Sequence, residues 1–243
     1  MAMEYLIEKF EEKGRQDLAR EIGAIRSKFG GDIPLPVDGK PNPVTPEVSE
    51  KIYPEISLEK EWGRQAQILA GYFAQELNLT SEQYIATLPQ FEPQPENWNG
   101  RLDTPVIIET RISPERQLDI VGVYEFFDVL KKTAWVQTPG YKILSGPDTA
   151  WLDDGRNHMN QASKDVKNSL KEDEVGGKIL DGLALFIVNP TILKKRSLDL
   201  PDSLVDEKFS VLLALWGNKP VLSYHLVGET VPSFGSVVRG RQK

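Results

Sequence analysis

The stretch FSVLLALWGNKPVLSYHLV, residues 209–227, decides the fold of this chain. Two runs rich in aliphatic and aromatic residues, 209–216 and 220–227, flank the turn residues Gly217-Asn218-Lys219. Turn residues between two such runs are typical of a β-hairpin. The C-terminal part of the chain is therefore predicted to contain an antiparallel pair of strands.

Outward from this hairpin, short strands and helices alternate along the chain. Residues 179–188 are almost wholly apolar and lead into Asn189-Pro190, which predicts a helix that ends before the proline. The fold class that the whole pattern predicts is α+β, with a mainly antiparallel sheet covered by helices on one face. Further elements are expected as strands at 106–110, 118–123, 141–144 and 149–152, a helix at 163–170, a helical turn at 191–196 and a turn at 200–203.

The first part of the chain is predicted to be helical. Apolar residues recur at three- and four-residue spacing over 6–29 and again over 58–77, where Ser57 is placed to cap the second helix. Thr80 begins a capping-box pattern for a short helix that ends near residue 88. Prolines recur between residues 33 and 54, which favours an extended strap rather than a helix.

A segment rich in proline and glycine, residues 89–103, divides the chain into two predicted regions. Residues 1–88 form an acidic helical region with its Pro-rich strap, and residues 104–243 form an α+β domain. Residues 1–100 carry 10 Lys and Arg against 17 Asp and Glu, which accounts for the whole net charge of −7. An acidic region of this kind argues against general nucleic-acid binding, which requires a basic surface.

The composition excludes several kinds of chemistry. The chain has no cysteine and only two histidines, His158 and His225, so thiol catalysis, disulfides and Cys-ligated zinc are ruled out. No apolar run approaches the roughly 20 residues of a membrane span. The absence of cysteine and of a basic, apolar leader at the start of the sequence leads us to expect a cytoplasmic protein.

One turn carries the residues best suited to catalysis. Asp153-Asp154-Gly155 is followed by Arg156 and His158. Adjacent carboxylates can bind a hard cation such as Mg²⁺ or Mn²⁺, so Asp153 and Asp154 are candidate metal ligands, and His158 is a candidate general base. The same three residues are therefore the candidate catalytic group. Asp-Asp-Gly is also a common turn sequence, and a purely structural turn is the interpretation that we favour for it.

Aromatic residues and one arginine are the candidates for ligand or partner contacts. Trp98 lies between two asparagines in the Pro-rich segment, where an aromatic side chain either anchors the loop on the core or contacts a partner. Trp151 and Arg156 flank the acidic turn and complete this group. The acidic segment Glu172–Glu174 is expected to be a solvated loop, and His225 is expected to be a structural residue in the last strand of the hairpin.

The region from Trp151 to Arg239 resembles an uncharacterised bacterial family, a domain of unknown function. The resemblance is carried by the order of elements: the Trp151–Gly155 turn, the apolar helix 182–190, the Leu-Pro-Asp-Ser segment at 200–203, the strand pair 211–222 and Phe234-Gly235-Ser236. Where such families often show Glu-Gly before the apolar helix, this chain has Asp181-Gly182. The resemblance implies a coherent C-terminal unit and no particular chemistry.

Three functions remain after these exclusions. The first is a non-catalytic protein without a cofactor that binds a ligand or a partner, with a homodimer or a protein partner held through the N-terminal helix. The second is a metal-dependent hydrolase or nuclease that uses Asp153, Asp154 and His158 with Mg²⁺ or Mn²⁺. The third is a nucleic-acid-associated regulator that uses residues 57–88 and the basic tail. The poor supply of nucleophiles favours the first.

Overall fold

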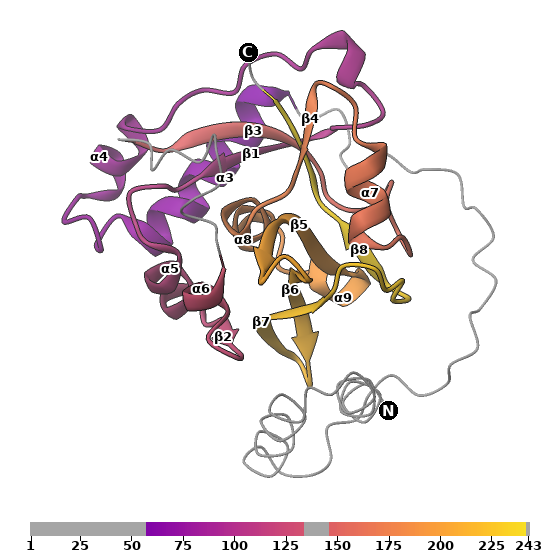
Figure 1. Cartoon of the computed structure of the whole chain (residues 1–243). Coiled ribbons are helices and arrows are strands. Elements are labelled where there is room, and N and C mark those ends of the chain that lie inside the picture. The colour runs from indigo at the N-terminus through magenta and orange to yellow at the C-terminus, as the bar shows by residue number, and fades with distance from the viewer. Residues whose placement is uncertain (1–56, 134–145, 242–243) are drawn as a thin grey trace. The chain divides into compact units, whose positions relative to one another are not determined.

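The computed structural model describes residues 57–133 and 146–241, and all statements below concern these residues. The predicted helix at 6–29, the strap at 33–54 and the strand at 141–144 lie outside them. Residues 57–215 and 220–241 belong to one compact unit. This unit combines helices with two sheets, which confirms the α+β class (Figure 1).

The strands form one antiparallel sheet and one mixed sheet. The first sheet has the order β1-β3-β9-β4, and every pairing in it is antiparallel. The second has the order β2-β7-β6-β5-β8, in which β2 runs parallel to β7 and β8 runs parallel to β5. The strands are β1 (Thr104–Ile108), β2 (Tyr124–Glu125), β3 (Asp148–Asp153), β4 (Glu174–Gly176), β5 (Ser197–Val205), β6 (Phe209–Trp216), β7 (Lys219–Leu226), β8 (Phe234–Ser236) and β9 (Val238–Gly240).

Helix α8 (Ile179–Val188) lies at the centre of the unit. All of its residues are buried, and it contacts β1 of the first sheet and β5 of the second. The predicted apolar helix and the predicted hairpin are both confirmed. The other helices are α3 (Leu58–Phe73), α4 (Ser81–Ala86), the short 3₁₀ helix η1 (Glu96–Trp98), α5 (Pro114–Val121), α6 (Val129–Lys132), α7 (Ser163–Ser169) and α9 (Ile192–Lys195).

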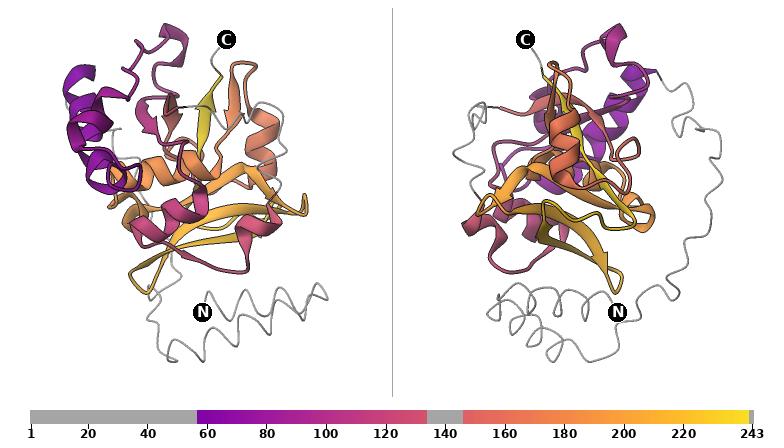
Figure 2. Two further views of the ribbon diagram at one scale, coloured as in Figure 1. Left: turned by 90° about the vertical axis from the view of Figure 1, so that its left-hand side faces the viewer. Right: turned by 45° about the vertical axis from the view of Figure 1, so that its right-hand side comes forward.

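Helix α3 protects the edge of the first sheet. Its Gln65 side chain is fully buried, and its amide donates to the carbonyl of Pro105 at 2.7 Å and accepts from the N–H of Ile107 at 3.0 Å. These two bonds satisfy backbone groups that an edge strand would otherwise leave unpaired. Figure 2 shows α3 packed with α4 at one side of the unit. The predicted caps at Ser57 and Thr80 are both confirmed.

Two local predictions are wrong. The strand expected at 118–123 is the end of helix α5, which Ser113 caps and Gly122 terminates in the left-handed conformation. Its β-branched residues were outweighed by these capping signals and by Pro114 in the first turn.

The second error concerns the turn expected at 200–203, which is the interior of strand β5. The register of β5 against β6 shifts between Leu200 and Leu204. Pro201 therefore lies in an irregular stretch of the ladder, where the missing N–H is tolerated.

The remaining predictions concern membrane spans and the division of the chain into two regions. No helix among residues 57–133 and 146–241 is long and apolar enough to cross a membrane. Helix α3 packs against β1 and α8 across the predicted boundary at 89–103. The division into two regions stays a prediction.

Candidate functional site

The acidic turn is buried at the end of strand β3. The Asp153 residue is only 3% exposed. Its Oδ1 accepts the N–H of Gly155 at 3.0 Å and that of Asn157 at 3.5 Å. Its Oδ2 is buried and has no hydrogen-bond partner, and His158 Nε2 lies 3.8 Å from it. One buried carboxylate oxygen of the turn therefore accepts no hydrogen bond.

Burial sets the proton affinity of Asp153. Removal from water disfavours the charged form, and the neighbouring Asp154 charge adds to this, so the pKa of Asp153 rises to about 7. The two backbone N–H donors and Arg156 act in the opposite direction without cancelling the shift. A carboxyl group that titrates near neutrality can exchange a proton at physiological pH.

Asp154 has the opposite character. Burial would raise its pKa, but the hydrogen bonds and charges of Arg156 and Arg196 outweigh it and lower the pKa. Arg156 donates to both carboxylate oxygens, at 2.9 and 2.8 Å, and Arg196 reaches Oδ2 at 3.3 Å. Arg156, a predicted ligand contact, is thus a partner of Asp154 within the turn.

This donor set does not fit a metal ion. A cation at Asp154 would have to displace or face two guanidinium groups, and Asp153 directs Oδ1 to the backbone. Within residues 57–133 and 146–241, no group of three His, Asp or Glu side chains could hold a metal. The acidic segment that begins at Glu172 does not supply a further metal ligand beside Asp153. Glu174 pairs with Gly240 on β9, whereas Asp153 pairs with Val238.

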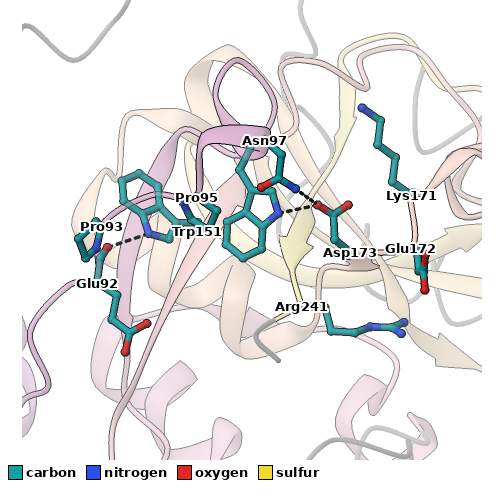
Figure 3. Close-up of a pocket in the computed structure, with 10 residues that line it drawn as sticks. Glu92, Pro93, Pro95, Asn97, Trp151, Lys171, Glu172, Asp173 and Arg241 are labelled. Carbon is teal, nitrogen blue, oxygen red and sulfur yellow. Dashed lines mark hydrogen bonds between the residues drawn. The ribbon is translucent and has the colours of Figure 1, made fainter.

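A pocket lies at the other end of β9. Its volume is about 1040 Å³, which is at the upper end of the range for small-ligand sites. Two of the predicted contact residues line it together: Trp98 from η1 and Trp151 from β3. The remaining lining residues are Glu92, Pro93, Pro95, Asn97, Lys171, Glu172, Asp173 and Arg241 (Figure 3).

Hydrogen bonds fix both indole rings. Trp151 donates from Nε1 to the carbonyl of Glu92 at 3.1 Å, and Trp98 donates from Nε1 to Asp173 Oδ2 at 2.8 Å. Both residues are buried, and the ring of Trp98 lies so close to Gly240 that a β-carbon there would approach within 2.4 Å. Trp98 therefore anchors its loop on the core while it forms part of the pocket wall.

Asp173 organises one side of the pocket. Its Oδ2 accepts from Asn97 at 2.6 Å and from Arg101 at 3.1 Å, in addition to the indole of Trp98. Arg101 also pairs with Glu174, which is buried at the start of β4. The prediction of a solvated loop over 172–174 is therefore wrong at Glu174, because the ion pair with Arg101 allows its burial.

A third polar cluster lies in the core of the second sheet. Asp199 of β5 accepts from His225 Nε2 at 2.9 Å and from the hydroxyls of Ser210 and Ser236, both at 2.5 Å. Ser163 Oγ lies 3.3 Å from the same His225 Nε2. A catalytic triad needs the serine and the aspartate on different ring nitrogens. Ser163, His225 and Asp199 therefore do not form a catalytic triad, and the structural role expected for His225 stays a prediction.

Sequence reasoning missed the residues that complete these sites. Asp173 and Arg241 are distant from each other and from Trp98 along the chain, and the β4–β9 pairing brings them together. Arg101 follows Trp98 by three residues and binds the same Asp173. The Asn97-Trp98-Asn99 sequence was the one local signal of the pocket. Comparisons of the chain with protein-family models, with curated proteins and with solved structures gave no match.

Proposed function

We propose that this protein is a binding protein and that the pocket between Trp98 and Trp151 holds its ligand. The observation that carries the proposal is that two tryptophans 53 positions apart, Trp98 and Trp151, line one pocket with their rings fixed. A preformed cavity with rigid aromatic walls loses little conformational entropy when a ligand enters. No catalytic group is required for this role.

The lining residues favour an amphipathic ligand. Pro93, Pro95 and the two indoles supply apolar surface, and charged side chains surround it. Each Trp N–H is already bonded to the protein, so the rings offer apolar contact rather than new hydrogen bonds. Specific polar contacts would then come from the rim.

Nuclear magnetic resonance of the indole N–H groups tests this proposal. A library of small polar and amphipathic compounds is added to the ¹⁵N-labelled protein, with signals assigned through Trp98→Phe and Trp151→Phe. Binding compounds are expected to shift the signals of Trp98 and Trp151. The signal of Trp62, whose N–H bonds to the carbonyl of Pro89 outside the pocket, should not move.

A pair of matched variants locates the site. Pro95→Phe places a bulky side chain at an exposed lining position and should weaken every genuine hit. Glu96→Phe adds the same bulk at the next residue, which is exposed and does not line the pocket. Equal loss of binding in both variants, or hits that leave both pocket tryptophans unmoved, would refute the proposal.

The unused oxygen of Asp153 favours a second candidate function, acid–base catalysis at the acidic turn. A buried carboxyl group with a raised pKa and a histidine 3.8 Å away has the properties of a proton-transfer pair. The metal-dependent form of this candidate has less support, since Asp154 is engaged by two arginines. The test is hydrogen–deuterium exchange between a bound compound and the solvent. The wild type should catalyse this exchange, and Asp153→Asn should not.

A further inference from the structure

We propose that the ligand of the Trp98–Trp151 pocket is a short peptide with free termini, whose carboxylate binds Arg241 and whose ammonium binds Glu92. This inference rests on the proposed binding function and gives it a chemical class. It is carried by charged side chains that line the pocket and are left unpaired at its two ends.

The Arg241 side chain does not pair with Asp173, the residue opposite it in the strand pair. The backbone N–H of Arg241 donates to the carbonyl of Asp173 at 2.8 Å, so the two residues sit opposite each other beyond the end of the β4–β9 ladder. Opposite charges in such a pair normally interact. Here Asp173 Oδ2 accepts from Trp98, Asn97 and Arg101 instead.

The consequence is an available guanidinium at the pocket. Among the residues that the structure describes, none forms an ion pair or hydrogen bond with the Arg241 side chain, which is exposed and lines the cavity. A guanidinium offers two parallel N–H donors, which match the two oxygens of a carboxylate. Lys171 lines the same side and adds positive potential there.

Glu92 marks the other end. Its carbonyl accepts the Trp151 indole, and Figure 3 shows Glu92 beside Trp151 and away from Asp173 and Arg241. Its carboxylate has no ion-pair partner within the described part of the chain and is exposed at the pocket. An ammonium group is the complementary ligand charge for this end.

The separation of the two charges decides the size of the ligand. In a free amino acid the ammonium and the carboxylate are carried by one carbon, whereas Glu92 and Arg241 lie on different sides of a pocket of about 1040 Å³ (Figure 3). A peptide of a few residues separates them by about 3.3–3.6 Å per residue when extended. It would also carry side chains for the apolar surface of Pro93 and Pro95.

The overall charge of the protein agrees with a zwitterionic ligand. The net charge is −7, which disfavours a multiply charged anion, whereas a peptide with free termini is neutral overall. The lining carries two cations, Lys171 and Arg241, against three acidic side chains, of which Asp173 is already paired with Arg101. The pocket is thus nearly balanced, as a neutral dipolar ligand requires.

The test uses tripeptides with apolar central residues, each in four forms: free, N-acetylated, C-amidated and doubly capped. Calorimetry measures binding to the full chain. Removing either terminal charge is expected to weaken binding about tenfold, in line with the loss of one charge-assisted hydrogen-bonded pair. In Arg241→Gln, amidation should no longer matter, while acetylation still should. Glu92→Gln should show the reverse.

The matched controls are Lys171→Gln and Glu172→Gln, which change lining charges without removing the two proposed contacts. They should retain both capping penalties. Equal penalties for amidation in the wild type and in Arg241→Gln would overturn the assignment of Arg241, and the corresponding result would overturn that of Glu92. If other compounds shift the pocket tryptophans but no free tripeptide binds, the peptide proposal fails and the binding function survives. If nothing shifts them, both fail.

Discussion

The acidic turn and the tryptophan pocket lie toward opposite ends of strand β9, and they differ in how their charged side chains are paired. In the turn, Asp153 and Asp154 are buried, and Asp154 is neutralised by two arginines. In the pocket, Arg241 and Glu92 remain exposed without ion-pair partners among the described residues. Removing one partner of a buried ion pair destabilises the fold, whereas unpaired charged side chains on a cavity remain available for a ligand.

Removing Asp154 should give the largest effect. Asp154→Ala leaves Arg156 and Arg196 partly buried without their shared carboxylate, and breaking a buried ion pair costs about 3–5 kcal/mol. We expect a loss of this size in the free energy of unfolding, measured by urea denaturation. Asp154→Asn, which keeps the shape and one acceptor, should lose less. A change below about 1 kcal/mol for Asp154→Ala would mean that the turn tolerates the loss of this shared carboxylate.

Asp153 should make stability depend on pH. Its pKa is about 7 in the folded state and 3.8 in the unfolded state, so the folded state binds the proton more tightly. Stability from this group is therefore complete below about pH 4 and falls as the pH rises toward 7 and above. Three pKa units correspond to about 4 kcal/mol as an upper bound.

Asp153→Asn isolates this contribution. The amide keeps an oxygen for the N–H groups of Gly155 and Asn157 but does not ionise. We expect the difference in unfolding free energy between variant and wild type to move in favour of the variant from pH 4.5 to pH 8. His158→Gln serves as the control, because His158 Nε2 lies 3.8 Å from Asp153 Oδ2. A difference that does not vary with pH would show that Asp153 is already ionised in the folded state.

Gly155→Ala should have an intermediate effect. Gly155 has a φ of +89°, and a β-carbon there would lie 2.6 Å from the carbonyl oxygen of Gly235. The strain and the forced separation of the turn from β8 together predict a loss of about 1–3 kcal/mol. Gly100→Ala, with a φ of +77° and open space around the β-carbon, is the matched control and should lose less. Thermal unfolding of both variants is measured. Because both positions have a positive φ, the difference between the two losses reports the effect of the close contact with Gly235.

The sequence predicted what depends on local signals. Three predicted features depend on signals that lie within a few neighbouring residues: the apolar helix at 179–188, the hairpin and the cap at Ser57. All three are confirmed. The strand expected at 118–123 is wrong because the caps at Ser113 and Gly122 determine a helix there, against the β preference of its β-branched residues.

The sites depend on distant pairings that no local pattern carries. Trp98 meets Asp173 because β4 pairs with β9, and a one-residue change of register would separate them. Asp153 and Asp154 are adjacent in the sequence, yet Asp153 Oδ2 has no hydrogen-bond partner whereas Asp154 pairs with two arginines, one of which, Arg196, comes from the C-terminal end of α9. Residue types alone could nominate Trp98, Trp151 and Asp153 but could not determine which charges stay unpaired.

Variants at the pocket rim should give the smallest effect on stability. Arg241→Gln and Glu92→Gln alter exposed side chains that have no ion-pair partner in the described part of the chain, and such substitutions usually change the unfolding free energy by less than about 0.5 kcal/mol. Urea denaturation of both variants should therefore overlay the wild type, even where ligand binding is lost. A destabilisation comparable to that of Asp154→Ala would mean that these charges support the fold, and the contrast between the turn and the pocket would disappear.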